Sequence, residues 1–219
     1  QPTCQHLHPS FLSLVLVSDS YLSRWHSYLN AAYLHAPITT VAQGGLFPVR
    51  SGGSHRLASG GMDLPRASQK VAAAAAEAGL RIDVTEFPEG TKTAADAAAA
   101  IGCEVAAIVK SLVFVVDEEP VVALVPGDRR LDTDRLAQTA GGNHVRRASL
   151  EEVREATGFA AGGTPPFGHA RTLRVFADHA LRRHDPVWAA AGTPTTVFPI
   201  SLADLERISR PRWADLSEE

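Results

Sequence analysis

The sequence predicts an α+β fold, in which short helices pack on a mixed β-sheet. The first observation is a long apolar run, residues 104–116, followed by turn-forming residues 117–120 and a second apolar run, residues 121–125. Two such runs around a turn predict a β-hairpin. The second observation is that helical and strand-like segments alternate irregularly around this hairpin, which favours one α+β domain on a mixed sheet over a regular parallel array.

The residues before the hairpin predict two alanine-rich helices and one strand. Residues 65–79 form the first helix, because proline suits a first turn, alanine favours helix and glycine stops it. Residues 80–87 alternate apolar and polar side chains, the pattern of a half-buried strand, and residues 88–90 form a turn. Thr93 caps a second helix, residues 94–101, which a glycine ends.

The residues after the hairpin predict shorter elements. One helix begins at Asp132, and a second begins at Ser149, where Ser-Leu-Glu-Glu forms a capping box. The remaining predicted elements are strands at residues 144–147, 173–176, 187–191 and 195–200 and a last helix at residues 201–208.

Lys110 interrupts the first apolar run of the hairpin. The chain has only two other lysines, Lys70 and Lys92. A lysine is almost never fully buried without a partner. Three explanations fit its position: the ammonium reaches solvent past the end of a strand, it pairs with a buried carboxylate, or it projects into a cleft where a charged ligand is its partner.

A rigid loop, Gly162-Gly-Thr-Pro-Pro-Phe-Gly168, is the second candidate for chemistry. Glycines allow a backbone to approach a ligand closely, and consecutive prolines stiffen the segment between them. A stiff loop can present backbone N–H groups to a carbonyl oxygen, as in an oxyanion hole. The prolines have no N–H, so the donors would be Gly163, Thr164, Phe167 and Gly168. The alternative is a tight turn between a helix and a strand.

The composition excludes several classes of protein. The apolar fraction of 45% and the charged fraction of 21% are those of an ordinary globular chain. The net charge of -3 does not indicate a chain that binds nucleic acid by its overall charge. Cys4 and Cys103 form no disulfide framework or CxxC site. No apolar run approaches the ~20 residues that span a bilayer. There is no GxSxG, HExxH, P-loop or GxGxxG motif.

The first 61 residues differ in composition from the rest. They hold all three tyrosines and only four charged side chains, three arginines and one aspartate, and they end in a Gly/Ser-rich stretch typical of a flexible linker. Met62, the only methionine, follows. We therefore predict that residues 1–61 are an N-terminal extension or upstream segment, and that residues 62–219, with a net charge of about -5, are the functional domain. A genuine N-terminal module is the alternative.

Three blocks of sequence resemble the YbaK/EbsC family, relatives of the editing domain of bacterial prolyl-tRNA synthetase. They are Ile-Val-Lys110-Ser-Leu-Val-Phe, the loop Gly162–His169 and the ending Gly192-Thr-Pro…Val-Phe-Pro-Ile…Asp204-Leu, and they agree with the family in order and spacing over residues 65–210. The resemblance implies a mixed, mostly antiparallel sheet curled toward a barrel with surrounding helices. It also implies a free-standing hydrolase that removes wrong amino acids from tRNA, in many members from tRNA(Pro).

The resemblance also assigns site residues. The family's lysine falls on Lys110, its GxxxP motif on Gly162 and Pro166, and an aspartate of some members on Asp178. The expected catalytic residues are Lys110, Gly162, Gly163 and Asp178. The expected substrate-binding residues are Thr93, Thr164, Pro165, Pro166, Phe167, Gly168 and His169. Pro165 stands where several members have Ser or Thr, which leaves the amino acid open.

The implied reaction is hydrolysis of an aminoacyl ester on the terminal ribose of tRNA. The Lys110 ammonium would hold the terminal phosphate or an ester oxygen, and the loop N–H groups would hold the carbonyl. Water would be activated by the ribose hydroxyl of the substrate or by Asp178. We expect no metal and no other cofactor. The expected partners are the acceptor end of aminoacyl-tRNA and prolyl-tRNA synthetase, in the cytoplasm and without a membrane.

Two other functions remain open on the sequence. One is a binding module of the same fold that holds aminoacyl-tRNA or an amino acid without hydrolysis. The other is a Schiff-base enzyme, which needs a Lys110 amine with a lowered pKa. Arginines that could contact tRNA phosphates are found at positions 129–130, 146–147, 171, 174 and 182–183, although solvated surface charge explains most of them.

Overall fold

The computed structural model describes residues 64–87 and 93–218, all within the unit that residues 58–219 form. The expected N-terminal extension, residues 1–61, and the expected turn at residues 88–90 lie outside the described residues. No helix in the described part is long and apolar enough to cross a bilayer.

The α-helices described are α1 (Arg66–Glu77), α2 (Ala94–Ile101), α3 (Thr133–Ala140), α4 (Leu150–Thr157) and α5 (Leu202–Ser209).

The main sheet has the strand order β1-β8-β7-β2-β3-β6-β9, with β5 also paired to β2. Most neighbours are antiparallel, whereas the pairs β2–β7, β3–β6 and β6–β9 are parallel. The predicted α+β fold on a mixed, mostly antiparallel sheet is therefore confirmed. The strands are β1 (Thr85–Glu86), β2 (Ile108–Val116), β3 (Glu119–Pro126), β5 (Val145–Arg147), β6 (Arg174–Asp178), β7 (Val187–Ala190), β8 (Thr196–Ile200) and β9 (Arg212–Ala214). A separate ribbon pairs β4 (Arg130–Leu131) with β10 (Ser217–Glu218).

The predicted hairpin is formed by β2 and β3, which pair over eight residues each, from Val109 opposite Pro126 to Val116 opposite Glu119. Its turn residues Asp117 and Glu118 both have positive φ, 46° and 72°, as a two-residue turn that matches the twist of the strands requires. The sequence prediction placed four residues in this turn, and two of them belong to β3 instead.

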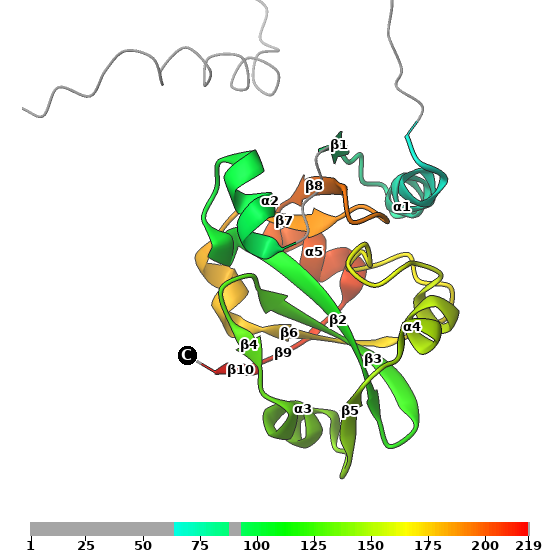
Figure 1. The fold of residues 1–219 in the computed structure, drawn as a ribbon, viewed down its shortest axis with the longest axis vertical. Coiled ribbons are helices and arrows are strands. Elements are labelled where there is room, and N and C mark those ends of the chain that lie inside the picture. Colours follow the sequence, from blue (N-terminus) through cyan, green and yellow to red (C-terminus); the bar gives the residue numbers. More distant parts are fainter. Residues whose placement is uncertain (1–63, 88–92, 219) are drawn as a thin grey trace, which may run out of the picture. The chain divides into compact units, whose positions relative to one another are not determined.

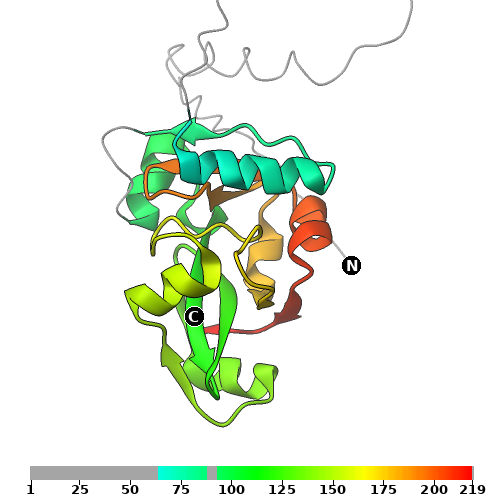
Figure 2. The same cartoon turned by 90° about the vertical axis from the view of Figure 1, so that its right-hand side faces the viewer.

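Side chains on the two faces of β2 enter different apolar cores. Val113 and Val115 pack in a core that α1, α4 and α5 cover, while Phe114 and Val116 pack in a second core that α3 covers. Ile108, at the start of β2, packs with α2 in a third cluster. Figures 1 and 2 show the hairpin through the middle of the domain, with α1 and β8 toward one end and α3 and β5 toward the other.

One strand prediction was too long. Within residues 80–87, only Thr85 and Glu86 pair with a neighbour, β8, although burial alternates along the segment as predicted. The short strands β4, β9 and β10 were not predicted, because two or three residues give no periodicity. Their pairing depends on distant segments.

Phe198 on β8 connects the core to the loop after α4. Its side chain is fully buried, and its ring meets Phe167 edge-on with the centroids 5.7 Å apart. We expect Phe198→Ala to lower the free energy of unfolding by about 3–5 kcal/mol, because it leaves a cavity. Urea unfolding measures this. Leu150→Ala is the control, since Leu150 is 76% exposed and should change stability by less than about 0.5 kcal/mol. Equal losses of unfolding free energy in the two variants would contradict the buried position of Phe198.

Candidate functional site

Lys110 lies in β2, opposite Val125 of β3, and its side chain is half-buried. The ammonium donates a hydrogen bond to the carbonyl of Arg129, in the turn after β3. Burial lowers the pKa of the Lys110 ammonium, and the nearby Asp128 carboxylate partly offsets this. An ammonium has three donors, and within the described residues this structure gives an acceptor to one. Lys110 is therefore a partly desolvated cation held at a turn.

The start of α2 lies against this same turn. A Cβ on Gly127 would stand 2.3 Å from the Val105 carbonyl oxygen and 2.9 Å from the Ala94 Cβ, so only glycine permits this approach. Thr93 precedes Ala94 and caps α2: its hydroxyl accepts from the Asp96 N–H at 3.1 Å, and the Asp96 carboxylate accepts from the Thr93 N–H at 3.0 Å. The predicted cap is confirmed, and the predicted contact of Thr93 with substrate stays a prediction.

The loop 162–168 is held close to the turn between β7 and β8. Gly162 and Gly168 have φ of 85° and 74°, which glycine adopts at little cost. A Cβ on Gly163 would stand 2.7 Å from the Thr193 backbone, and the Gly163 carbonyl accepts from the Gly192 N–H at 2.9 Å. The close backbone approach that the glycines predicted is thus made to the chain's own turn.

Some of the loop's predicted donors are occupied. The N–H of Gly163 donates to the Ala160 carbonyl at 3.0 Å. In this conformation it therefore cannot also donate to a substrate oxygen. The buried Thr164 hydroxyl donates to the same carbonyl at 3.3 Å. The N–H groups of Thr164, Phe167 and Gly168 have no acceptor within the described part of the chain. These three remain as candidate donors for an oxyanion.

Lys110 and the loop are connected through β7. Strand β7 runs parallel to β2, with Ala189 beside Val109, so Ala190 follows beside Lys110. Two strand residues span about 7 Å and neighbouring strands lie about 4.8 Å apart, which places Gly192 on the order of 10 Å from Lys110. The described residues include no direct contact between Lys110 and the loop.

Ser111, next to Lys110, has a buried hydroxyl oxygen without a partner in the described residues. The sequence analysis did not predict Ser111 as a site residue.

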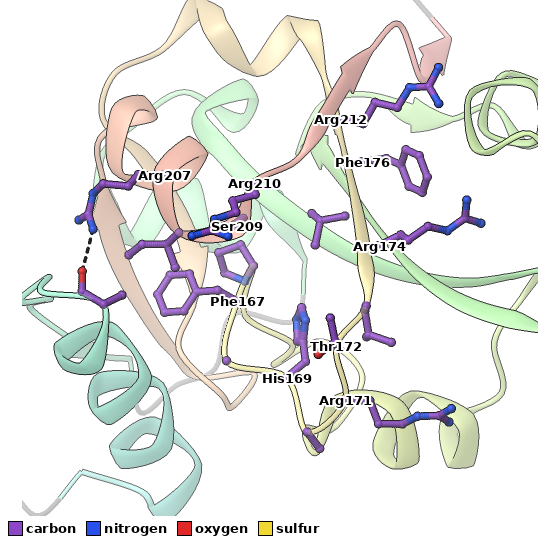
Figure 3. Close-up of a pocket in the computed structure, with 17 residues that line it drawn as sticks. Phe167, His169, Arg171, Thr172, Arg174, Phe176, Arg207, Ser209, Arg210 and Arg212 are labelled. Atoms are coloured by element: carbon purple, nitrogen blue, oxygen red, sulfur yellow. Dashed lines mark hydrogen bonds between the residues drawn. The ribbon is translucent and has the colours of Figure 1, made fainter.

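A hollow of about 830 Å³ opens along the C-terminal part of the loop. Phe167, Gly168 and His169 all line it, and Figure 3 labels Phe167 and His169. The imidazole Nε2–H of His169 donates to the Pro165 carbonyl at 2.9 Å, and burial lowers the pKa of His169, which keeps the ring neutral near pH 7. The described lining also includes five arginines: Arg171, Arg174, Arg207, Arg210 and Arg212. The last three were not predicted as site residues, because α5 and β9 reach the hollow only through the tertiary fold.

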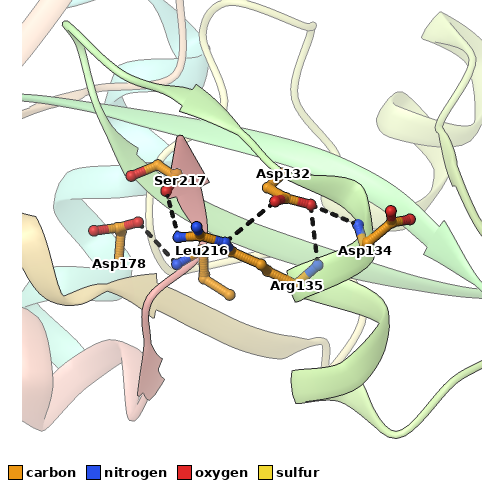
Figure 4. A network of polar contacts seen from close by, with 6 residues as sticks. All are labelled: Asp132, Asp134, Arg135, Asp178, Leu216 and Ser217. Carbon is orange, nitrogen blue, oxygen red and sulfur yellow. Dashed lines mark hydrogen bonds and ion pairs between the residues drawn. The ribbon is translucent and has the colours of Figure 1, made fainter. Parts of the chain in front are cut away.

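Asp178, the expected catalytic aspartate, is buried and fully hydrogen-bonded. Its two oxygens accept from the N–H groups of Ala180, at 2.7 Å, and Leu216, at 3.0 Å. Figure 4 shows it beside the network in which Arg135 donates to the Ser217 carbonyl at 2.8 Å. The carboxylate thus fastens the C-terminal strands to β6. It lines a second hollow together with Arg129, whose carbonyl binds Lys110. Its action on water stays a prediction.

Among the described residues, no group of three or more His, Cys, Asp and Glu side chains could hold a metal ion. The described residues of this site offer hydrogen-bond donors and cations. Such groups can bind phosphate and stabilise negative charge on an oxygen.

Comparison with known proteins identifies the family. The model of the aminoacyl-tRNA editing domain matches residues 88–208. YwhH of Bacillus subtilis is 34% identical over 139 residues, which are 63% of this chain and 88% of YwhH. EbsC of Enterococcus faecalis, a candidate Cys-tRNA(Pro)/Cys-tRNA(Cys) deacylase, is 30% identical over 60% of this chain and 80% of EbsC.

Longer relatives and solved structures agree with this. The proline–tRNA ligase of Maridesulfovibrio salexigens is 40% identical over 116 residues, 51% of this chain, but the chain spans only 20% of that ligase. The solved structure of a candidate trans-editing enzyme for prolyl tRNA synthetase is 41% identical, with a TM-score of 0.68 over 71% of this chain and 99% of that one. The chain belongs to the aminoacyl-tRNA editing domain family, as its resemblance to YbaK and EbsC predicted.

Proposed function

We propose that this chain hydrolyses the ester of a mischarged aminoacyl-tRNA, and that its tRNA is tRNA(Pro). The observation that carries the proposal is the likeness to the candidate trans-editing enzyme for prolyl tRNA synthetase, which extends over 99% of that protein at 41% identity. A match of that extent favours an editing domain that acts on its own.

The ester is bound between two sets of donors. The Lys110 ammonium, with two N–H groups beyond the one that binds the Arg129 carbonyl, holds the terminal phosphate or an ester oxygen by a charge-assisted hydrogen bond. The N–H groups of Thr164, Phe167 and Gly168 donate hydrogen bonds to the developing oxyanion. The aminoacyl-ribose bridges the gap between Lys110 and the loop.

Water attacks the carbonyl carbon, the ester C–O bond breaks, and the products are the free amino acid and a ribose hydroxyl. The proton that the water loses ends on the leaving ribose oxygen, and it is relayed there by the neighbouring ribose hydroxyl of the substrate or by Asp178. The Asp178 carboxylate already accepts two backbone N–H groups, and this favours the ribose hydroxyl.

The first test compares Lys110→Met with wild type on tRNA(Pro) charged with Ala, Cys, Ser or Thr. We expect wild type to hydrolyse one of these and Lys110→Met to lose about 100-fold or more of the rate, the usual loss when one preorganised donor is removed. Lys70→Met is the matched control, because Lys70 is exposed on α1, and it should retain full activity. Wild-type binding of the charged tRNA without hydrolysis would favour the binding module instead.

The second test concerns the loop. Gly163→Ala places a methyl group 2.7 Å from the Thr193 backbone, so the loop must shift and misplace its N–H groups. We expect a loss of about 1–3 kcal/mol of stability together with a lower kcat. Gly79→Ala is the control: its φ is positive, but nothing lies within 4 Å of the added carbon, so only stability should fall. Unchanged kcat in folded Gly163→Ala would contradict a role for the loop.

The third test is the pH dependence of turnover. Because burial lowers the pKa of Lys110 below its ordinary value of 10.5, the active ammonium is lost as the pH rises through this lowered pKa, and kcat should fall there after subtraction of the uncatalysed rate. In the same window the unfolded chain binds more protons, so the contribution of this group to stability rises with pH. A kcat that rises with pH instead would indicate a neutral amine, as the Schiff-base mechanism requires, and borohydride trapping would then identify it.

A further inference from the structure

Within residues 64–87 and 93–218, the lining of the hollow beside the loop includes five arginines and no aspartate or glutamate. This is a strong local concentration of charge in a chain whose net charge is -3. We propose that it binds the sugar-phosphate backbone of the tRNA acceptor end, and this inference rests on the proposed function. Guanidinium groups suit such a partner, because their planar fork matches two phosphate oxygens.

Two of these five arginines have no carboxylate partner among the described residues, and two more have only weak ones. Arg210 and Arg212 have no carboxylate within 4 Å in residues 64–87 and 93–218. Arg171 meets Glu155 at 3.8 Å and Arg174 meets Glu119 at 3.9 Å. The side chains of both pairs are largely exposed, and such ion pairs contribute little.

Arg207 is different, since its guanidinium binds Asp204 at 2.8 Å and the Ala78 carbonyl at 2.7 Å. It therefore links α5 to the end of α1 and holds one edge of the hollow, as the dashed line in Figure 3 shows.

The fold holds two of these arginines side by side. Arg212 on β9 pairs in register with Phe176 on β6, and the Arg174 guanidinium lies 5.5 Å from the centre of the Phe176 ring while it donates to the Ala140 carbonyl at 2.9 Å. Arg174 and Arg212 therefore flank one aromatic side chain, and Arg210 lies nearer Phe167 (Figure 3). A backbone that runs along these groups reaches the loop at Phe167.

Arg210 occupies an unfavourable backbone conformation. It is the C-cap of α5 with φ 45°, a left-handed position where glycine or asparagine is preferred. A side chain other than these is strained there, and strain that the fold maintains points to a use for the side chain. Ser209, just before it, has a buried hydroxyl oxygen without a partner in the described residues and also lines the hollow.

An acidic protein segment is the competing partner. RNA is favoured because the hollow is continuous with the loop: residues 166–168 form the end of the loop and also line the hollow. A ligand that places an ester at the loop carries its phosphates along the same path.

The test measures binding of uncharged tRNA(Pro) to the full chain by fluorescence anisotropy over a series of NaCl concentrations. The variants are Arg210→Asn, Arg212→Gln and the double variant. We expect the double variant to bind about tenfold more weakly and to reduce the slope of log K against log salt by about 2, since each lost phosphate contact removes about one unit. Arg210→Asn should keep or raise the melting temperature, because asparagine tolerates the left-handed conformation.

The matched control is Arg66→Gln combined with Arg81→Gln, two exposed arginines outside the hollow, which should leave affinity and slope unchanged. Equal affinity and slope in wild type and the hollow variant would overturn the inference. So would displacement of the RNA by polyglutamate at equal charge concentration, or the absence of RNA binding by wild type at low salt.

This binding assay needs no hydrolysis, so the two proposals fail separately. Arginine-dependent binding without deacylation of any charged tRNA would retain the inference and reject the hydrolase. Deacylation that depends on Lys110 but not on Arg210 and Arg212, at any salt concentration, would support the proposed hydrolase activity. It would reject the proposal that the hollow binds the RNA backbone.

Discussion

The antiparallel pairing of β2 with β3 determines the position of Lys110. In the observed register Lys110 faces Val125 and lies at the boundary between the cluster around Ile108 and the core around Phe114. There its ammonium reaches a carbonyl of the next turn. A slip of one residue would exchange the two faces of the strand and carry the charge into the core that Val113 occupies. The tight turn at Asp117 and Glu118 prevents this slip, because its loop length and positive φ values fix the register.

The sequence predicts the parts of this fold that local rules decide. Alternating and continuous apolar runs identify the hairpin, and capping residues such as Thr93 and Ser149 begin their helices as expected. The rest depends on long-range contacts. Residues 80–84 have the pattern of a strand but pair with no strand in the part of the chain that the structure describes. Asp178 has the chemistry of a general base, but its two oxygens are occupied by N–H groups, one of them 38 residues further along the chain.

The loop combines buried side chains with free backbone donors. Thr164 and Phe167 are 3% and 5% exposed, so their side chains serve to anchor the segment, while their N–H groups have no acceptor in the described residues. An oxyanion hole needs this division, because donors that do not reorganise stabilise charge best. The anchors that supply the rigidity are the core contact with Phe198 and the hydrogen bond from Gly192. The sequence indicated a stiff loop from its prolines, but not the surfaces that hold it.

The charges of the site divide into two kinds with different dependence on pH. Arginine stays protonated over the pH range in which the protein is assayed. The affinity of Arg210 and Arg212 for a phosphate backbone therefore depends on salt concentration and not on pH. Lys110 is partly desolvated and its pKa is lowered, so its charge is lost at a pH where the arginines still bind. Capture of the tRNA and reaction at the ester are therefore physically separable steps. A domain with a net negative charge can hold a polyanion in this way, provided that its free arginines gather where the polyanion must pass to reach the loop.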